Sequence, residues 1–109
     1  RIEAISARTA GGGGEIVKLL ERGSAFYAPG SAAAIMAESV LNDRRRVIPA
    51  SCYLEGQYGL EDVYIGVPCI IGANGVEEIF ELELTDNELE SLQGSANFYK
   101  GQLKDILGY

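Results

Sequence analysis

The first twenty residues have a helical pattern of apolar side chains that a run of glycines interrupts. The apolar positions between residues 2 and 20 are Ile2, Ile5, Ile16, Leu19 and Leu20. Four consecutive glycines occupy residues 11–14, and each costs a helix about 1 kcal/mol relative to alanine. Such a run is typical of a kink or of a close approach by another part of the backbone. We expect one of these two features at residues 11–14.

A second helical pattern, rich in alanine, runs through residue 42. Gly23 ends the preceding segment, and the side-chain oxygen of Ser24 is of the kind that caps a helix N-terminus. Pro29 and Gly30 then interrupt the first turns of the pattern. Because proline cannot donate a backbone hydrogen bond, we expect a kink at this point or two abutting helical pieces.

In the second half of the chain the apolar period changes to two, which predicts strands. A first strand is expected at 47–54, where Pro49 indicates a sheet edge or a bulge. Residues 63–71 are almost wholly apolar, so the second strand is expected to be covered on both faces. The Asn74-Gly75 pair predicts a hairpin turn. A third strand is expected at 76–84, where apolar and acidic side chains alternate from residue 80 onward, which predicts one buried face.

The last part of the chain predicts one long helix. Thr85 and Glu88 have the spacing of a capping box, which marks a helix start. One apolar stripe follows at three- and four-residue steps, formed by Leu89, Leu92, Ala96, Tyr99, Leu103 and Ile106. The order of elements is therefore two helical segments, three antiparallel strands and a final helix. It predicts the α+β class, with antiparallel strands packed against helices.

Length and charge exclude several classes of partner. With 109 residues the chain is long enough for one small domain. Its net charge of −7 argues against nucleic acid, whose phosphates require Lys and Arg, and against anionic membrane surfaces. No stretch approaches 18 consecutive apolar residues, so no membrane span is expected. A soluble, self-repelling surface accounts for the charge, and adaptation to high salt stays open as an alternative. Because the chain begins with Arg1 and no basic-then-apolar leader follows, we expect its start to be a cut end.

Cysteine and histidine usage limits the possible chemistry further. Cys52 and Cys69 lie inside apolar runs and are expected to behave as small buried hydrophobes in a reducing compartment. The chain has no CxxC pair and no histidine, so no metal site is expected. The absence of histidine also removes the commonest general base at neutral pH.

The glycine run at residues 11–14 also invites a phosphate-binding interpretation, since exposed backbone N–H groups bind anions. A phosphate loop, however, follows a strand and is followed by Lys-Ser or Lys-Thr, and neither is present here. A helix kink or a close backbone approach is therefore favoured over a nucleotide site.

The other candidates for chemistry are two charged groups and two serines. The glutamates at residues 77, 78, 81 and 83 alternate with apolar side chains, which favours a solvated strand face over paired acid/base carboxylates. The arginines at residues 44–46 lie where a helix C-terminus favours cations, and we prefer that role to binding an anionic substrate. Ser24 and Ser51 have no base in the chain, so neither is a credible nucleophile. Residue chemistry alone predicts no more than an acidic α+β domain.

Ordered strings of residues carry a more specific signal. They are 12–17 (GGGEIV), 23–29 (GSAFYAP), 53–59 (YLEGQYG), 64–68 (YIGVP) and 71–77 (IGANGVE). In this order they resemble the C-terminal half of the malate dehydrogenases in the lactate/malate dehydrogenase family. Each string alone is a weak motif. Together, in this order between residues 12 and 77, they are strongly specific.

The resemblance implies that residues 1–109 are the C-terminal, substrate-side domain of an NAD-dependent malate dehydrogenase. The family's N-terminal dinucleotide-binding domain, its substrate-binding arginines and its Asp-His proton relay have no counterpart in this chain. The chain alone is therefore predicted to be inactive. The parent enzyme is expected to interconvert malate and oxaloacetate by hydride transfer with NAD in the tricarboxylic acid cycle. It is expected to be a cytoplasmic homo-oligomer.

The resemblance also implies roles for five residues of this chain. Gly13 and Gly14 are expected to pass close to the bound substrate, where side chains would intrude. Ala25 is expected to line the substrate pocket, with Ser24 as a neighbour, and Pro29 to pack on the nicotinamide of NAD. These roles concern the shape of the site, and none of them moves a proton or supplies a charge.

Two alternatives stay open. The first, within the same class of enzyme, is a lactate or other 2-hydroxyacid dehydrogenase, because the loop that sets substrate choice in this family lies in the half that is absent. The second, from another class, is a separated, non-catalytic fragment that acts as an oligomerisation or interaction module.

Overall fold

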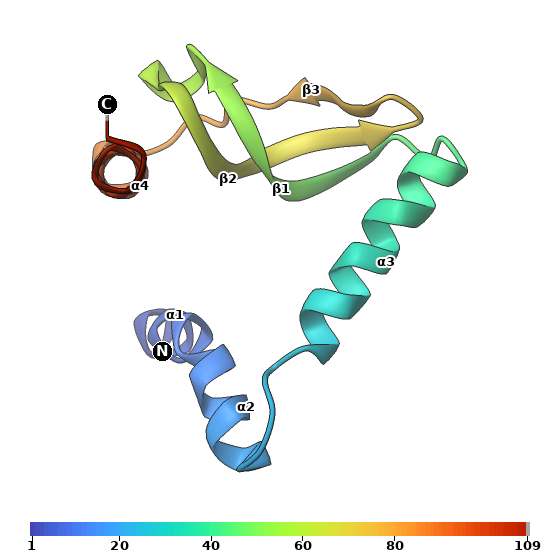
Figure 1. Ribbon diagram of the computed structural model, residues 1–109, viewed down its shortest axis with the longest axis vertical. Coiled ribbons are helices and arrows are strands. Elements are labelled where there is room, and N and C mark those ends of the chain that lie inside the picture. The colour runs from blue at the N-terminus through green and yellow to red at the C-terminus, as the bar shows by residue number, and fades with distance from the viewer. Residues whose placement is uncertain (109) are drawn as a thin grey trace. The chain divides into compact units, whose positions relative to one another are not determined.

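The computed structural model describes residues 1–108 in two compact units, which we call unit 1 (Arg1–Ala37) and unit 2 (Glu38 onward). Unit 1 contains helices α1 (Ile2–Ala10) and α2 (Gly12–Leu20), and helix α3 (Tyr27–Leu41) begins in it. Unit 2 contains the end of α3, strands β1 (Arg46–Glu55), β2 (Glu61–Gly72) and β3 (Gly75–Ile79), a 3-10 turn (Gln57–Gly59) and helix α4 (Asp86–Leu107) (Figure 1). The predicted α+β class is confirmed.

In unit 1, the glycine run marks the boundary between α1 and α2. The helical path breaks at Gly11, whose N–H donates to the carbonyl of Ala7 at 3.3 Å. Gly12, Gly13 and Gly14 then form the first turn of α2. A Cβ added at any of these three would have no atom outside its own helical backbone and chain neighbours within 4 Å. The predicted kink is therefore confirmed, and within unit 1 no close backbone approach accounts for the run.

Helix α3 begins later than the sequence predicts and is unbroken. It starts at Tyr27, and its first turn is closed by the N–H of Gly30 donating to the carbonyl of Phe26 at 2.9 Å. Pro29 lies in this first turn, where an N–H has no intrahelical acceptor and its absence costs nothing. The predictions of an N-cap at Ser24 and of a kink at Pro29 are therefore wrong.

The three strands of unit 2 form one antiparallel sheet in the order β1-β2-β3 (Figure 1). The pairing of β1 with β2 starts with Arg46 opposite Ile71 and is regular as far as Leu54. Because β1 has only one neighbour in this sheet, the prediction that Pro49 marks an edge strand is confirmed. The hairpin predicted by Asn-Gly is also present, and Gly75 adopts the positive φ of +86° that favours glycine.

The core of unit 2 lies on one face of the sheet. Its buried apolar side chains are Ala50, Cys52, Leu54, Tyr58, Leu60, Val63, Ile65, Val67, Cys69, Ile71 and Ala96. Along β2, buried residues alternate with exposed or half-buried ones, and Tyr64 is 66% exposed. The prediction that this strand is covered on both faces is therefore wrong within the described chain. The outward positions of β2 are filled by Tyr64, Gly66, Pro68 and Ile70, which are largely apolar without being enclosed.

Strand β3 is shorter than its alternating pattern suggests, ending at Ile79 instead of Leu84. The segment that follows is bound to the hydroxyl of Tyr58. This hydroxyl donates to the carbonyl of Phe80 at 2.7 Å and accepts the N–H of Leu82 at 3.0 Å. These bonds replace the sheet ladder beyond residue 79, so the alternation continues without a strand.

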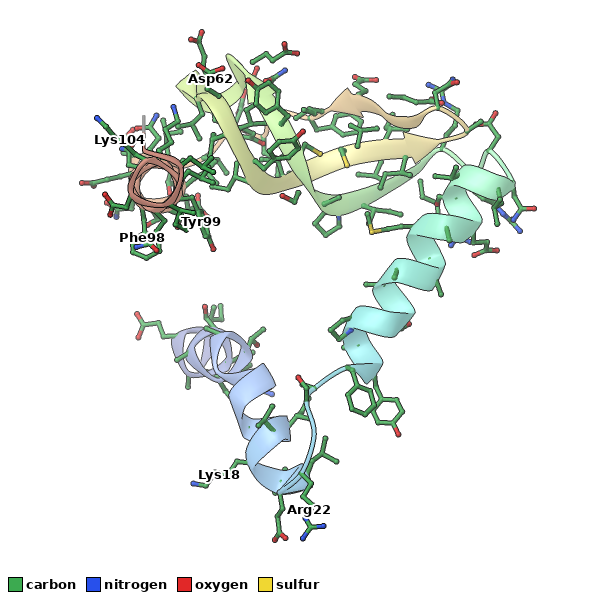
Figure 2. The ribbon with its side chains drawn as sticks, in the orientation of Figure 1. Lys18, Arg22, Asp62, Phe98, Tyr99 and Lys104 are labelled. Carbon is green, nitrogen blue, oxygen red and sulfur yellow. The ribbon has the colours of Figure 1, made fainter. Side chains whose placement is uncertain are left out.

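Helix α4 starts as predicted. The capping box is present: the Thr85 side chain faces the backbone N–H of Glu88, and the Glu88 carboxylate accepts the backbone N–H of Thr85 at 2.9 Å. The Thr85 hydroxyl also donates to this carboxylate at 2.7 Å. The apolar stripe is covered only in part: Ala96 is buried, whereas Tyr99, Leu103 and Ile106 are about half exposed or more. Figure 2 shows Tyr99 and the neighbouring Phe98 projecting from one side of this helix.

None of the helices in residues 1–108 combines the length and the apolar character needed to cross a bilayer.

Candidate functional site

The residues that the sequence predicts for a substrate site all lie in unit 1. Gly13 and Gly14 are exposed in the first turn of α2, where backbone N–H groups lack intrahelical acceptors. Neither glycine has a side chain, and a Cβ added to either would meet no neighbour within 4 Å, so open space lies beside the helix. A bulkier residue at either position would fill that space.

The other three predicted residues follow each other along the connection into α3. Ser24 is exposed and its carbonyl accepts the N–H of Phe26 at 2.9 Å, while Ala25 is half-buried. Pro29 is exposed in the first turn of α3, and the adjacent Gly30 has no atom within 4 Å of an added Cβ. The structure therefore places these three on one segment and the glycines on another segment of the same unit.

None of these five residues carries a titratable side chain, and the sequence contains no histidine. Gly13, Gly14 and Ala25 can shape a cavity, and the Ser24 hydroxyl can exchange hydrogen bonds with a ligand. Acid–base chemistry at neutral pH needs a group with a pKa near 7, which this segment does not provide. The arrangement is suited to forming one wall of a binding site.

Sequence reasoning missed an ion pair beside the glycines. The Arg8 guanidinium on α1 donates to both carboxylate oxygens of Glu15 on α2, from Nη2 at 2.8 Å and from Nε at 3.1 Å. This contact lowers the pKa of Glu15 and raises that of Arg8. The two residues border an open hollow of about 440 Å³, whose other lining residues are Ile5, Thr9, Gly12, Ile16 and Leu19. In the sequence, the signal for this ion pair was the opposite charges of Arg8 and Glu15 on either side of residues 11–14.

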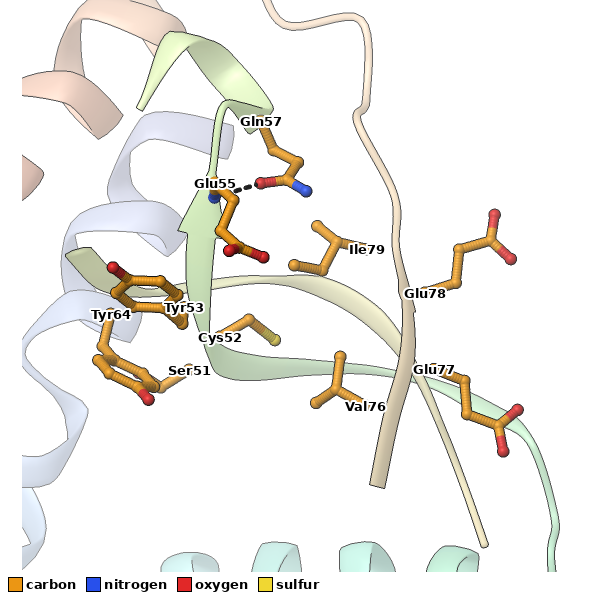
Figure 3. A pocket seen from close by; sticks show the side chains of 10 residues that line it. All are labelled: Ser51, Cys52, Tyr53, Glu55, Gln57, Tyr64, Val76, Glu77, Glu78 and Ile79. Carbon is orange, nitrogen blue, oxygen red and sulfur yellow. Dashed lines mark hydrogen bonds between the residues drawn. The ribbon is translucent and has the colours of Figure 1, made fainter. Parts of the chain in front are cut away.

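A second open hollow, of about 460 Å³, lies in unit 2 beside β1 and β3. Figure 3 shows the Cys52 side chain directed into it, and Glu77 and Glu78 directed away from it. It contains none of the residues predicted for substrate or cofactor.

The sequence predicted a solvated face for the glutamates at residues 77, 78, 81 and 83, but two of them have partners within the chain. Glu77 is paired with Arg45 at 2.9 Å, and its side chain is only 17% exposed. Glu81 accepts the backbone N–H of Tyr58 at 2.6 Å. Their spacing matches a solvated face, but the hairpin and the 3-10 turn bring partners to both carboxylates.

The arginines that follow α3 are engaged in ion pairs. Arg44 and Arg46 both contact Glu38, at 3.2 and 2.9 Å. Together with the Arg45–Glu77 pair, these contacts fix the connection between α3 and β1. The predicted position at the C-terminus of α3 is confirmed, since α3 ends at Leu41 and the backbone N–H of Arg44 donates to the carbonyl of Ser39 at 2.9 Å. The three guanidinium groups bind carboxylates of the chain itself, which does not support the alternative of an anion site.

Cys52 and Cys69 are both buried among apolar side chains, as predicted, and no disulfide joins them. Burial, together with the neighbouring Cys69 thiol, raises the pKa of Cys52 to about 11. The thiol form therefore dominates at neutral pH, and the side chain is a poor nucleophile. Within residues 1–108 no group of three or more Cys, Asp or Glu side chains is placed to bind a metal ion.

The family model for the lactate/malate dehydrogenase alpha/beta C-terminal domain matches residues 1–108. The chain belongs to the lactate/malate dehydrogenase family. Among curated relatives of this dehydrogenase domain, the malate dehydrogenase of Roseiflexus sp. (strain RS-1) is 56% identical over 96 residues, covering 88% of this chain and 31% of the relative. That of Bacillus israeli is 52% identical over 107 residues, covering 98% of this chain and 34% of the relative. The dehydrogenase domain thus spans about a third of the length of the curated relatives that it matches.

Solved structures of dehydrogenases share the fold. The malate dehydrogenase of Salinibacter ruber has a TM-score of 0.93 and 48% identity, covering 98% of this chain and 35% of that chain. The lactate dehydrogenase of Eimeria maxima, crystallised with NADH and oxamate, has the same TM-score and the same identity. The match covers 98% of this chain and 33% of that chain. The likeness to the family's C-terminal domain that the ordered strings indicated is therefore confirmed for this dehydrogenase domain.

Proposed function

We propose that this chain is the substrate-side, C-terminal domain of an NAD-dependent malate dehydrogenase. The match of residues 1–108 to the family's C-terminal domain, with relatives named malate dehydrogenase at 52–56% identity, carries the proposal. The whole enzyme transfers a hydride between NAD and the carbon that is a carbonyl in oxaloacetate and an alcohol in malate. The Asp-His proton relay and the charged substrate contacts come from parts of the enzyme outside these 109 residues, because this chain has no histidine.

The substrate-facing wall in this proposal consists of Gly13, Gly14, Ser24 and Ala25. Its support is the absence of a side chain at the two glycines and the open space beside them. The wall limits the shape of the dicarboxylate, and the Ser24 hydroxyl is available for a hydrogen bond. The charge of the substrate is balanced from the other domain.

In this proposal one further residue of the chain, Pro29, contacts NAD. The exposed Pro29 in the first turn of α3, followed by Gly30 with open space above it, leaves room for a flat aromatic ring. Pro29 would then pack on the nicotinamide and help to orient it. Bound NAD supplies the hydride acceptor, while the rest of the cofactor is held by the dinucleotide-binding domain.

The proposed assembly is a cytoplasmic homo-oligomer that works in the tricarboxylic acid cycle. The support for an oligomer is that none of residues 1–37 is buried, although several are large aliphatic or aromatic side chains. Apolar helices of this kind are stable when another domain or subunit covers them.

A lactate dehydrogenase is the second candidate, favoured by the 48% identity to the Eimeria maxima enzyme. Reduction of oxaloacetate and of pyruvate by NADH, measured with the full-length protein, separates the two. We expect kcat/KM for oxaloacetate to exceed that for pyruvate. The reverse order would assign the enzyme to lactate.

The wall itself is tested by Gly13→Val in the full-length protein. We expect kcat/KM for oxaloacetate to fall by at least about tenfold, because the new side chain fills space that the substrate needs, while the melting temperature changes little. Gly101→Val is the matched control, since Gly101 is also a helical glycine with no atom within 4 Å of an added Cβ. Equal kcat/KM values for the two variants would remove Gly13 from the site.

A further inference from the structure

The corner between α1 and α2 is intrinsically weak. Each helix has nine residues and no buried side chain. Helices of this length are marginal in water, and the three glycines in the first turn of α2 weaken it further. The glycine backbone can also adopt conformations closed to other residues, so its orientation depends on the contacts around it.

One side-chain contact spans this weak segment. Arg8 and Glu15 bracket the glycine run, and their two hydrogen bonds of 3.1 and 2.8 Å join the guanidinium and the carboxylate in a bidentate geometry. Residues seven apart in an unbroken helix are separated by about 10.5 Å along the axis. Because the helical path breaks at Gly11, the Arg8 and Glu15 side chains come within 2.8 Å of each other. A bidentate pair fixes the direction of both side chains, which a single contact does not.

We propose that Arg8 and Glu15 are positioning residues that hold Gly13 and Gly14 in the orientation that receives the substrate. The inference rests on the proposed function of these glycines. Glu15 directly follows Gly14 in the chain, so restraining its side chain restrains the peptide groups of the first turn of α2. Neither charged group needs to touch the substrate. Losing the pair lets the glycine segment sample other conformations and weakens substrate binding, because the binding geometry is no longer prepared in advance.

The test compares steady-state kinetics of Arg8→Gln, Glu15→Gln and the charge-exchanged R8E/E15R protein, all in the full-length dehydrogenase. We expect KM for oxaloacetate to rise roughly two- to fivefold in each single variant, as for the loss of an exposed ion pair. KM for NADH, kcat and the melting temperature should stay near their original values. The exchanged pair should restore KM for oxaloacetate, since it can rebuild the contact in reverse.

Lys18→Gln is the control, because Lys18 is a charged residue of α2 that forms no ion pair among residues 1–108. It should leave KM for oxaloacetate unchanged. An unchanged KM in Arg8→Gln and Glu15→Gln, or a raised KM that the exchanged pair does not lower, overturns the inference. A fall in melting temperature that accounts for the whole loss of activity also overturns it, since the pair would then be merely structural.

The result for Gly13→Val separates failure of this inference from failure of the proposed function. If Gly13→Val impairs turnover and Arg8→Gln does not, the glycine wall stands and the ion pair is not needed to position it. If Gly13→Val leaves kcat/KM for oxaloacetate unchanged, the glycines do not face the substrate. The proposed glycine wall and the proposed positioning role of the ion pair then both fail.

Discussion

Tyr58 is the residue on which the segments of unit 2 converge. Its backbone adopts a left-handed conformation, with φ of 56° and ψ of 20°, which few non-glycine residues adopt without support. The support comes from four hydrogen bonds. The Tyr58 hydroxyl donates to the carbonyl of Phe80 and accepts the N–H of Leu82. The Tyr58 N–H donates to the Glu81 carboxylate, and its carbonyl accepts the side-chain amide of Gln93 at 3.1 Å. One residue thus connects the 3-10 turn to the segment that follows β3 and to α4.

Removing only the hydroxyl of Tyr58 should therefore destabilise the fold. We expect Tyr58→Phe to lower the free energy of unfolding by about 1–3 kcal/mol, because the Leu82 N–H loses its acceptor in a partly buried position. Urea denaturation measures this change. Tyr64→Phe, at a position 66% exposed, should cost less than about 0.5 kcal/mol. Equal effects of the two variants would show that the Tyr58 hydroxyl bonds contribute nothing to stability.

Some features of the predicted site follow from local sequence and others do not. Gly13 and Gly14 could be placed at a break between helices from the glycine run alone, since that signal is local. The opposite charges of Arg8 and Glu15 make an ion pair possible but do not predict it, because the pairing depends on the angle between two helices, which spacing along the chain does not define.

Among the elements, those predicted best are specified by neighbouring residues. Thr85 and Glu88 define the start of α4, and Asn74-Gly75 defines the hairpin. The wrong boundary of β3 has a distant cause, since the Tyr58 hydroxyl that binds Phe80 comes from 22 residues earlier in the chain. The coverage of β2 was overestimated for a similar reason: apolar composition does not reveal how many layers lie against a strand.

The β2–β3 hairpin offers a test at the scale of an element. A Cβ on Gly72 would lie 2.5 Å from Oε1 of Glu77 and 2.9 Å from Oδ1 of Asp43. The Asp43 carboxylate accepts the N–H of Ala73 at 2.9 Å, and Glu77 pairs with Arg45. A Cβ at residue 72 would therefore require both carboxylates to move away from these partners.

We therefore expect Gly72→Ala to destabilise unit 2 by about 1–3 kcal/mol, the usual cost of overpacking. Thermal unfolding followed by circular dichroism measures it. Gly66→Ala is the matched control on the same strand, where an added Cβ has no atom within 4 Å. That variant should be neutral or slightly stabilising, since alanine has less freedom in the unfolded chain. If Gly72→Ala is equally neutral, the hairpin can rearrange around residue 72 at little cost.

At the scale of the whole molecule, unit 1 presents apolar helices without a core of its own. Ile2, Leu19 and Tyr27 are each more than 75% exposed. Covering one large aliphatic side chain is worth about 1.5–3 kcal/mol, so several together rival the stability of a small domain. The net charge of −7 opposes association but is spread over the chain.

We expect the 109-residue chain, when purified alone, to be marginally stable and to self-associate through these helices. Sedimentation velocity at several protein concentrations should show a mass that rises with concentration. A monodisperse monomer with a cooperative melting transition would show instead that the chain is self-sufficient as a domain.

The central claim is that this chain is the substrate-side part of a dehydrogenase whose chemistry requires a second domain. It is tested most directly by steady-state oxidation of NADH with oxaloacetate, measured side by side for the 109-residue chain and for the full-length protein that contains it. We predict turnover by the full-length protein and none above the buffer blank for the chain alone, because the chain has no histidine and no dinucleotide-binding unit. Robust turnover by the chain alone would contradict the account, as would a folded full-length protein that does not oxidise NADH.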